Sequence, residues 1–248
     1  MLPYNPKDFS ISSYRDLLKN LNTTHRPILY KNVKECNEEK PYVLLRHDVD
    51  MSPQNSLVLS KIEHEENIKS TYFIQLAGWF YNVFEPEIKS IFLEIKSLGH
   101  DIGLHFDPSI YHINSIEDLE KNILFEKNIL EQLLNIKINV FSFHNPADKH
   151  IDMNEFEIAG LINAYSSFFK KNAIYTSDSN GYWRHQSISD AIRSNPKCNL
   201  QILTHPEWWG VELLDPKSKV KKIIKNRARE TYRNHLYLMI KANRKYVK

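Results

Sequence analysis

Short apolar runs alternate along the chain with longer stretches in which apolar residues recur every three or four positions. The short runs have the length and composition of buried strands, and the longer stretches have the period of amphipathic helices. The predicted strands span residues 42–46, 70–75, 101–105, 138–143, 164–167 and 199–204, and the predicted helices span residues 54–67, 85–98 and 115–134. Residues 174–183 are expected to be irregular. Strands that alternate with helices in this way form parallel βα units.

The number of predicted strands and the chain length together favour one barrel-like domain. A chain of 248 residues is long enough to bury a single core, and α/β barrels reach this size as one domain. Six or seven strands fit a distorted (β/α)6–7 barrel of the α/β class better than an open doubly wound sheet. We assign residues 1–214 to this barrel. The sequence contains neither of the glycine-rich motifs that bind phosphate in nucleotide-binding folds.

Charge is distributed unevenly along the chain, which carries a net +3. Residues 215–248 contain twelve Lys or Arg against two acidic residues, a net charge of +10, which leaves −7 for the rest. Apolar residues at helical spacing lie between these cations, which predicts a basic C-terminal helical extension packed on the barrel. Contact with an anionic membrane surface or a phosphate-bearing substrate is the alternative. No nucleic-acid-binding motif accompanies the charge, so a nucleic-acid partner is not expected.

The N-terminal residues show no basic segment followed by an apolar one, which a secretory signal would require. No later stretch approaches the roughly 18 consecutive apolar residues of a membrane span. These observations predict a cytoplasmic protein. Cys36 and Cys198 lie far apart without metal-binding spacing, so both are expected to be free thiols.

Side chains that can bind metals gather directly after four of the predicted strands. They are His47, Asp48 and Asp50 after the first, His105 and Asp107 after the third, His144 after the fourth, and His205 after the last. Any one of these histidines could be an ordinary hydrogen-bonded residue. Barrel enzymes, however, place their active sites at the carboxyl ends of their strands, and the repetition at equivalent strand ends predicts such a site.

The aspartates at positions 48 and 50 suit two different roles. In an extended segment, residues i and i+2 project to the same side, so Asp50 can bind a divalent ion while Asp48 acts as a general base beside it. A bound divalent ion lowers the pKa of water to about 7 and so yields a nucleophile at neutral pH. Alternatively, Asp50 caps the helix that begins near Ser52 and Pro53.

Three sequence blocks resemble the polysaccharide deacetylase family, a divergent branch of carbohydrate esterase family 4. They are LLRHDVD at 44–50, LGHDIGLHFD at 98–107 and ILTHPEWW at 202–209, and the resemblance covers about residues 42–209. It implies a distorted (β/α)7 barrel and a divalent ion, zinc by preference. Residue by residue, it implies metal binding by Asp50 and His105, a general base at Asp48 and a general acid at His205.

The chain departs from the family pattern at the third metal ligand. Where the family has its second ligand histidine, this sequence has Ser109. The candidates to replace it are His144, His112 and Asp107, and we favour His144 because its strand should lie beside that of His105. The segment FSFHNP at 141–146 also replaces the family's arginine-bearing segment, so the residue that pairs with the base is expected to be missing.

Several further residues are predicted to contact the substrate. Indole rings near the barrel mouth offer flat faces for sugar rings, and charged side chains can hold hydroxyl or phosphate groups. The predicted set is Arg46, Asp107, Asp178, Trp183, Arg184 and Trp208. A buried position in the core is the ordinary alternative for the tryptophans.

Together these features predict a metal-dependent amide hydrolase. The expected reaction removes an N-acetyl or N-formyl group from an amino sugar or sugar conjugate, nucleotide- or lipid-linked, during surface-polysaccharide biosynthesis. The alternative is a non-catalytic sugar-binding or assembly protein on the same barrel. Asp48 and His205 distinguish the two, because a binding protein needs neither a base nor an acid beside the metal.

Overall fold

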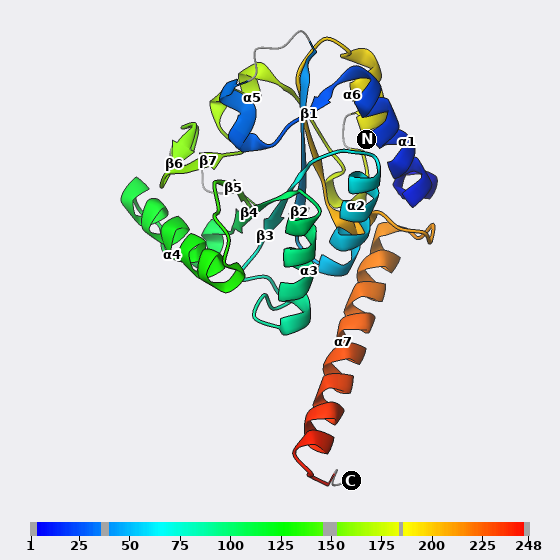
Figure 1. The fold of residues 1–248 in the computed structure, drawn as a ribbon, viewed down its shortest axis with the longest axis vertical. Coiled ribbons are helices and arrows are strands. Elements are labelled where there is room, and N and C mark those ends of the chain that lie inside the picture. Colours follow the sequence, from blue (N-terminus) through cyan, green and yellow to red (C-terminus); the bar gives the residue numbers. More distant parts are fainter. Residues whose placement is uncertain (1–3, 36–39, 146–152, 184–185, 246–248) are drawn as a thin grey trace.

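A curled, mainly parallel sheet forms the centre of the computed structural model, which describes residues 4–35, 40–145, 153–183 and 186–245 (Figure 1). Its strands lie in the order β6-β7-β5-β4-β3-β2-β9-β8, and β1 pairs with the beginning of β2. Among the described residues, every pairing except that of β6 with β7 is parallel. The bounds are β1 Arg26–Pro27, β2 Tyr42–Val49, β3 Thr71–Ile74, β4 Asp101–Phe106, β5 Val140–Phe143, β6 Glu157–Ile158, β7 Leu161–Asn163, β8 Ile174–Ser177 and β9 Leu200–Thr204.

Helices cover the outer face of this sheet, and α1 to α4 contact one another in sequence order. The α-helices are α1 Ile11–Thr24, α2 Pro53–Glu65, α3 Pro86–Ser97, α4 Ile116–Leu134, α5 Ser167–Asn172, α6 Ile188–Ser194 and α7 Pro216–Lys241. Short 3-10 helices are η1 Pro6–Phe9, η2 Tyr30–Glu35, η3 Pro108–Ile110, η4 Ser179–Gly181 and η5 Pro206–Trp208. This arrangement confirms the predicted single-domain α/β fold with a distorted barrel.

Two segments differ from the predicted elements. The strand expected at residues 164–167 lies earlier, as β7, because Ser166 already precedes the first turn of α5. The segment expected to be irregular, residues 174–183, contains strand β8 and helix η4. β8 is an edge strand that pairs only with β9 in the described part of the chain, and two of its residues are exposed. Its apolar pattern is correspondingly weak.

A buried carboxylate, Glu63 of α2, joins the helix layer to the sheet. It accepts hydrogen bonds from Ser70 Oγ at 2.6 Å, from Tyr72 OH at 2.9 Å and from Tyr14 OH. The His47 imidazole contacts it at 2.6 Å, and the other ring nitrogen of His47 lies 2.6 Å from Thr204 Oγ1. Burial tends to raise the pKa of Glu63, but His47 outweighs it and the pKa falls to about 2. The carboxylate therefore stabilises the fold in its charged form.

Glu63→Gln is expected to destabilise the protein by about 3–5 kcal/mol, because removing one member of a buried charged network leaves its partners unpaired. A group whose pKa is lowered by folding contributes stability above its unfolded pKa, near 4.5, and loses it as the pH falls toward 2. Urea unfolding from pH 7 to pH 2.5 should show this acid loss in the wild type and a smaller one in Glu63→Gln. If the wild type and Glu63→Gln lost the same unfolding free energy on acidification, other carboxylates would be responsible for the loss.

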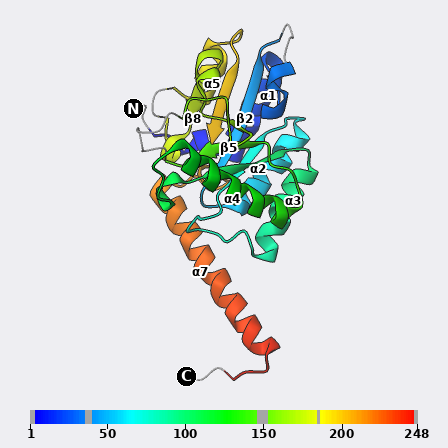
Figure 2. The same ribbon diagram turned by 90° about the vertical axis from the view of Figure 1, so that its left-hand side faces the viewer.

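Helix α7, which was expected as a basic extension over residues 215–248, contacts the barrel through its first half. Lys219 is buried, and Arg227 pairs with Glu85 at 2.5 Å in the loop before α3. Beyond this point the helix projects away from the domain (Figures 1 and 2). Leu238 is 60% exposed and Ile240 is 78% exposed. The apolar residues near the end of α7 therefore have no barrel surface to cover them. In the described part of the chain, the helices are all too short or too polar to cross a membrane.

Candidate active site

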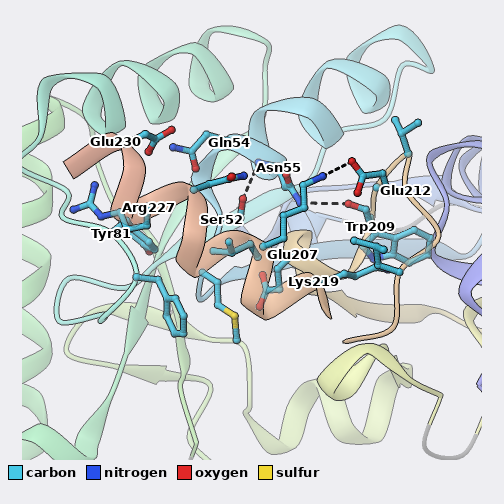
Figure 3. Close-up of a pocket in the computed structure, with 18 of the residues that line it drawn as sticks. Ser52, Gln54, Asn55, Tyr81, Glu207, Trp209, Glu212, Lys219, Arg227 and Glu230 are labelled. Atoms are coloured by element: carbon cyan, nitrogen blue, oxygen red, sulfur yellow. Dashed lines mark hydrogen bonds and ion pairs between the residues drawn. The ribbon is translucent and has the colours of Figure 1, made fainter. Parts of the chain in front are cut away.

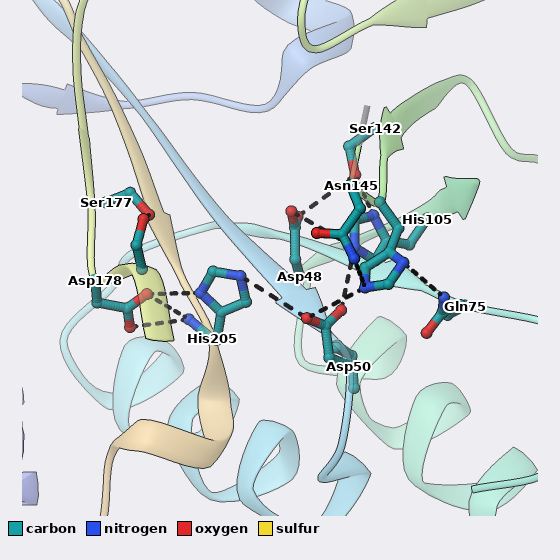
Figure 4. Close-up of polar contacts among 12 residues, drawn as sticks. Asp48, Asp50, Gln75, His105, Ser142, Asn145, Ser177, Asp178 and His205 are labelled. Atoms are coloured by element: carbon teal, nitrogen blue, oxygen red, sulfur yellow. Dashed lines mark hydrogen bonds and ion pairs between the residues drawn. The ribbon is translucent and has the colours of Figure 1, made fainter. Parts of the chain in front are cut away.

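Polar side chains from four strands meet at the carboxyl end of the sheet (Figure 4). Asp48 lies in β2 with Asp50 just beyond it, His105 lies in β4, and His144 and His205 directly follow β5 and β9. Single donor atoms of Asp50, His105 and His144 lie within 4.8 Å of one another. The pocket that contains them has a volume of about 210 Å³.

Strand alternation explains how β2 presents its acids to this pocket. Asp48 lines the pocket, whereas His47 faces α2 and the Glu63 network. Ser52, not Asp50, caps α2: its side chain accepts from the Asn55 amide, and Pro53 occupies the first turn. Because the cap is already supplied, the alternative role for Asp50 is removed, and its carboxylate is free to face the histidines.

His105 is held so that one ring nitrogen faces Asp50. Its Nδ1 lies 2.8 Å from Ser142 Oγ on the neighbouring strand β5, and its Nε2 lies 3.1 Å from Asp50 Oδ1. Burial tends to raise the pKa of Asp50, but the hydrogen bond and charge of His105 outweigh it and lower that pKa. On the same strand, a Cβ at Gly103 would come within 2.6 Å of the Phe73 ring. A larger residue there would displace β4.

His144 is oriented in the same manner by a carboxylate. Its Nδ1 lies 2.8 Å from Asp107 Oδ2, and its Nε2 lies 4.0 Å from Asp50 Oδ2. The Gln75 amide adds a contact of 3.2 Å to the same Nδ1. Of the three candidates for the third metal ligand, Asp107 contacts the His144 imidazole instead of facing Asp50. His112 is exposed. The geometry favours His144.

Arg46 supplies the partner that Asp48 was expected to lack, two residues away on the same strand. Its Nη2 donates to Asp48 Oδ2 at 2.9 Å. Its guanidinium lies 4.8 Å from the centre of the Tyr165 ring and 5.4 Å from that of Phe73. At 1% exposure, Arg46 is positioned to hold Asp48, and its predicted contact with substrate stays a prediction.

Asp178, predicted to contact the substrate, holds the His205 imidazole in this structure. The carboxylate accepts from the His205 backbone amide at 2.9 Å and lies 2.7 Å from His205 Nδ1. Trp209 Nε1 donates to it at 2.9 Å. Burial opposes a positive charge on His205, but Asp178 outweighs burial and raises the His205 pKa to about 10. Its Nε2 lies 4.0 Å from Asp50 Oδ2, so a protonated imidazole faces the site.

The two tryptophans predicted to contact sugar rings belong to the core. Trp183 is 6% exposed and stacks on Phe9 with ring centres 4.8 Å apart. Trp208 is 5% exposed and packs in the same apolar cluster. Their burial agrees with the alternative of a core position for both rings. Arg184 lies outside the described residues.

Other residues line the pocket without having been predicted. They are Phe143, Asn145, Tyr165, Tyr175, Ser179, Asn180 and Leu203. Asn145 directly follows His144, and its position after a strand was a usable signal. Tyr165 and Tyr175 reach the pocket through the turn after β7 and through edge strand β8, which the apolar pattern did not identify. These side chains are the better candidates for substrate contact.

Neither the protein-family models nor the curated proteins contain a match to this chain. Solved structures similar in fold include a mutant CE4 family pseudoenzyme with restored enzymatic activity, whose wild type is from Bacillus anthracis (12% identity, TM-score 0.47). The match covers 79% of this chain and 64% of that chain, so this chain spans less than two thirds of its length. Others are the chitin deacetylase of Colletotrichum lindemuthianum (11% identity, 75% and 81% covered, TM-score 0.45) and a Streptococcus pyogenes deacetylase in complex with acetate (14%, 84% and 86%, 0.44). The solved structures that this chain is similar to in fold thus include two deacetylases and a pseudoenzyme of the CE4 family.

Proposed function

We propose that this protein is a metal-dependent hydrolase that removes an N-acyl group, acetyl or formyl, from an amino sugar or sugar conjugate. The observation that carries the proposal is one carboxylate, Asp50, placed among two histidines with Asp48 on one side and His205 on the other. A base, an acid and a metal-competent cluster are the parts that amide hydrolysis requires. The motif resemblance to polysaccharide deacetylases points to the same reaction.

The side chains fit a divalent ion held by Asp50, His105 and His144. Asp50 Oδ1 is buried and lies 3.1 Å from His105 Nε2. Each imidazole has its Nδ1 engaged by another side chain and turns its Nε2 toward Asp50, the orientation typical of metal-binding histidines. Two imidazoles and one carboxylate suit zinc. When bound, the ion would polarise the acyl carbonyl and lower the pKa of water.

The flanking residues divide the two proton transfers between them. Asp48, fixed by Arg46, accepts the proton of the attacking water. His205, held in its charged form by Asp178, donates a proton to the departing amine, which would otherwise be a poor leaving group. The amine thus leaves neutral, and the acyl group leaves as a carboxylic acid.

The choice of substrate rests on the pocket lining. Its tyrosines and asparagines can hydrogen-bond to sugar hydroxyl groups. We propose a sugar linked to a nucleotide or a lipid on a route to surface polysaccharide, handled in the cytoplasm.

A direct test is to measure amine release from N-acetyl and N-formyl amino sugars, free and nucleotide-linked, by protein loaded with zinc or cobalt. Turnover that disappears on chelation and returns on metal addition is the expected result. Binding of these sugars without turnover, in a sample with about one ion per chain, would support the non-catalytic alternative. Asp48→Asn protein gives the background rate.

Asp178→Asn is expected to lose activity at a lower alkaline pH than the wild type. An amide carries no charge to stabilise the imidazolium, so the His205 pKa falls from its raised value of about 10 toward its ordinary range. A bound metal ion also lowers this pKa in both proteins, so the comparison between them is what counts. The alkaline limb of kcat against pH should move down by about one unit or more. An unmoved limb would assign the acid role to another group.

The end of α7 supports a further part of the proposal, peripheral contact with an anionic membrane. Exposed Tyr237, Leu238 and Ile240 lie in a segment with a net charge of +10. Apolar residues ringed by cations bind interfaces that carry anionic lipid, and the same charge opposes pairing with a second copy. The wild type should sediment with vesicles containing phosphatidylserine but not with phosphatidylcholine alone, and a Leu238→Glu, Ile240→Glu variant should not. Equal sedimentation of the two proteins would contradict this contact.

A further inference from the structure

A second cavity lies between the first turns of α7, the start of α2 and the loop before α3 (Figure 3). Its volume is about 300 Å³, which is at the lower end of small-molecule sites. It shares no lining residue with the candidate active site. The mechanism above uses none of its side chains, so its polar groups need a separate explanation.

Apolar side chains from several elements line much of this cavity. They include Met51, Phe80, Tyr81, Ile88, Trp209 and Ile223. The Tyr81 hydroxyl donates to the Val49 backbone oxygen at 2.7 Å, which fixes one of these aromatic walls to the end of β2. Such walls favour a ligand with an apolar body.

The cations of the cavity already have partners within the protein. Lys219 Nζ donates to the Trp208 backbone oxygen, Lys222 contacts Glu212 at 2.5 Å, and Arg227 donates to both oxygens of Glu85 at 2.7 and 2.5 Å. An anionic ligand would have to break one of these contacts. The lining therefore does not favour a phosphate or a carboxylate.

Among the described residues that line this cavity, Glu207 of η5 has a buried side-chain oxygen without a hydrogen-bond partner. The residue is 3% exposed, and the unpaired oxygen is Oε2. Figure 3 shows Glu207 among the side chains that line the cavity. A buried acceptor left unpaired costs about 1–3 kcal/mol. Burial and the neighbouring negative charge of Asp50 raise the pKa of Glu207, and a positive charge beside it would stabilise the carboxylate form.

We propose that this cavity binds a small organic amine, whose ammonium group donates to Glu207 Oε2 while its apolar body packs against Tyr81 and Trp209. An ammonium group supplies both the missing donor and a compensating charge. Aromatic faces next to it attract the same cation. A purely apolar ligand would fill the cavity but leave Oε2 unpaired.

Titration calorimetry with n-hexylamine and with hexan-1-ol tests this site, since the two share one apolar body. The wild type should bind hexylamine saturably and hexanol at least about tenfold more weakly, because a charged hydrogen bond contributes about 1.5–3 kcal/mol. Glu207→Gln should weaken hexylamine binding by about the same factor. Glu230→Gln, which changes a carboxylate of the same lining, should leave it within about twofold.

Two further variants distinguish binding in this cavity from binding at the active site, and loss of binding from loss of folding. His105→Ala protein without metal should still bind hexylamine, because an amine that merely coordinated the metal would be lost there. Ile223→Trp, which fills the cavity, should abolish binding even if Glu207→Gln proves too unstable to measure. Equal affinity for amine and alcohol, unchanged affinity in Glu207→Gln or Ile223→Trp, or no saturable binding to the wild type would each overturn the proposal.

Discussion

Asp50→Ala and His105→Ala proteins are expected to retain only a small fraction of the one divalent ion per chain that the wild type should bind. Each change removes one of three converging donors, and zinc sites nearly always have at least three protein ligands. Activity should fall with metal content. Elemental analysis after dialysis measures the loss of metal. Full metal content in both variants would show that Asp50 and His105 do not bind the ion.

His144 and its neighbour provide the internal comparison for this site. If His144 is the third ligand, His144→Ala should lose metal about as readily as His105→Ala. Asp107→Asn removes only the group that orients the imidazole, so its metal affinity should fall by a smaller factor, about 10–100-fold. His112→Ala, at an exposed position, should bind metal normally. A His144→Ala protein that binds the metal with wild-type affinity would show that His144 is not the third ligand.

Asp48→Asn is expected to keep its metal and lose turnover by about a hundredfold or more, the usual contribution of a general base. The amide occupies the same volume but cannot accept the proton of water. The comparison variant is Asp101→Asn, which changes another buried carboxylate, one paired with Lys96 at the start of β4 and away from the pocket. That variant should retain turnover. Full activity in metal-loaded Asp48→Asn would place the base on another residue.

Much of the fold followed from the apolar pattern because the central strands are buried on both faces. β2, β3, β4, β5 and β9 were each predicted from continuous apolar runs, and the structure confirms them. The edge strand β8 was not predicted, because two of its four residues are exposed and its pattern is weak. Helix α1 was not predicted either, although its buried residues Tyr14, Leu17, Leu18 and Leu21 recur at helical spacing.

The candidate site was predictable wherever a side chain acts at the end of its own strand. Asp48, Asp50, His105, His144 and His205 are brought together by parallel strands that end at one edge. The roles of Arg46 and Asp178 were not predictable, because each depends on a contact with a specific neighbour. Trp183 and Trp208 were assigned to substrate, yet three-dimensional packing against Phe9 and its neighbours covers them.

The pairing of Arg46 with Asp48 within one strand makes the base and its anchor a single rigid unit. When the anchor lies on a different loop, that loop must keep its conformation for catalysis to survive. Here both partners belong to β2, so their pairing does not depend on the conformation of any loop. His144 and Asn145, which directly follow β5, also line the pocket, and a change in their conformation would leave the Arg46–Asp48 pair in place.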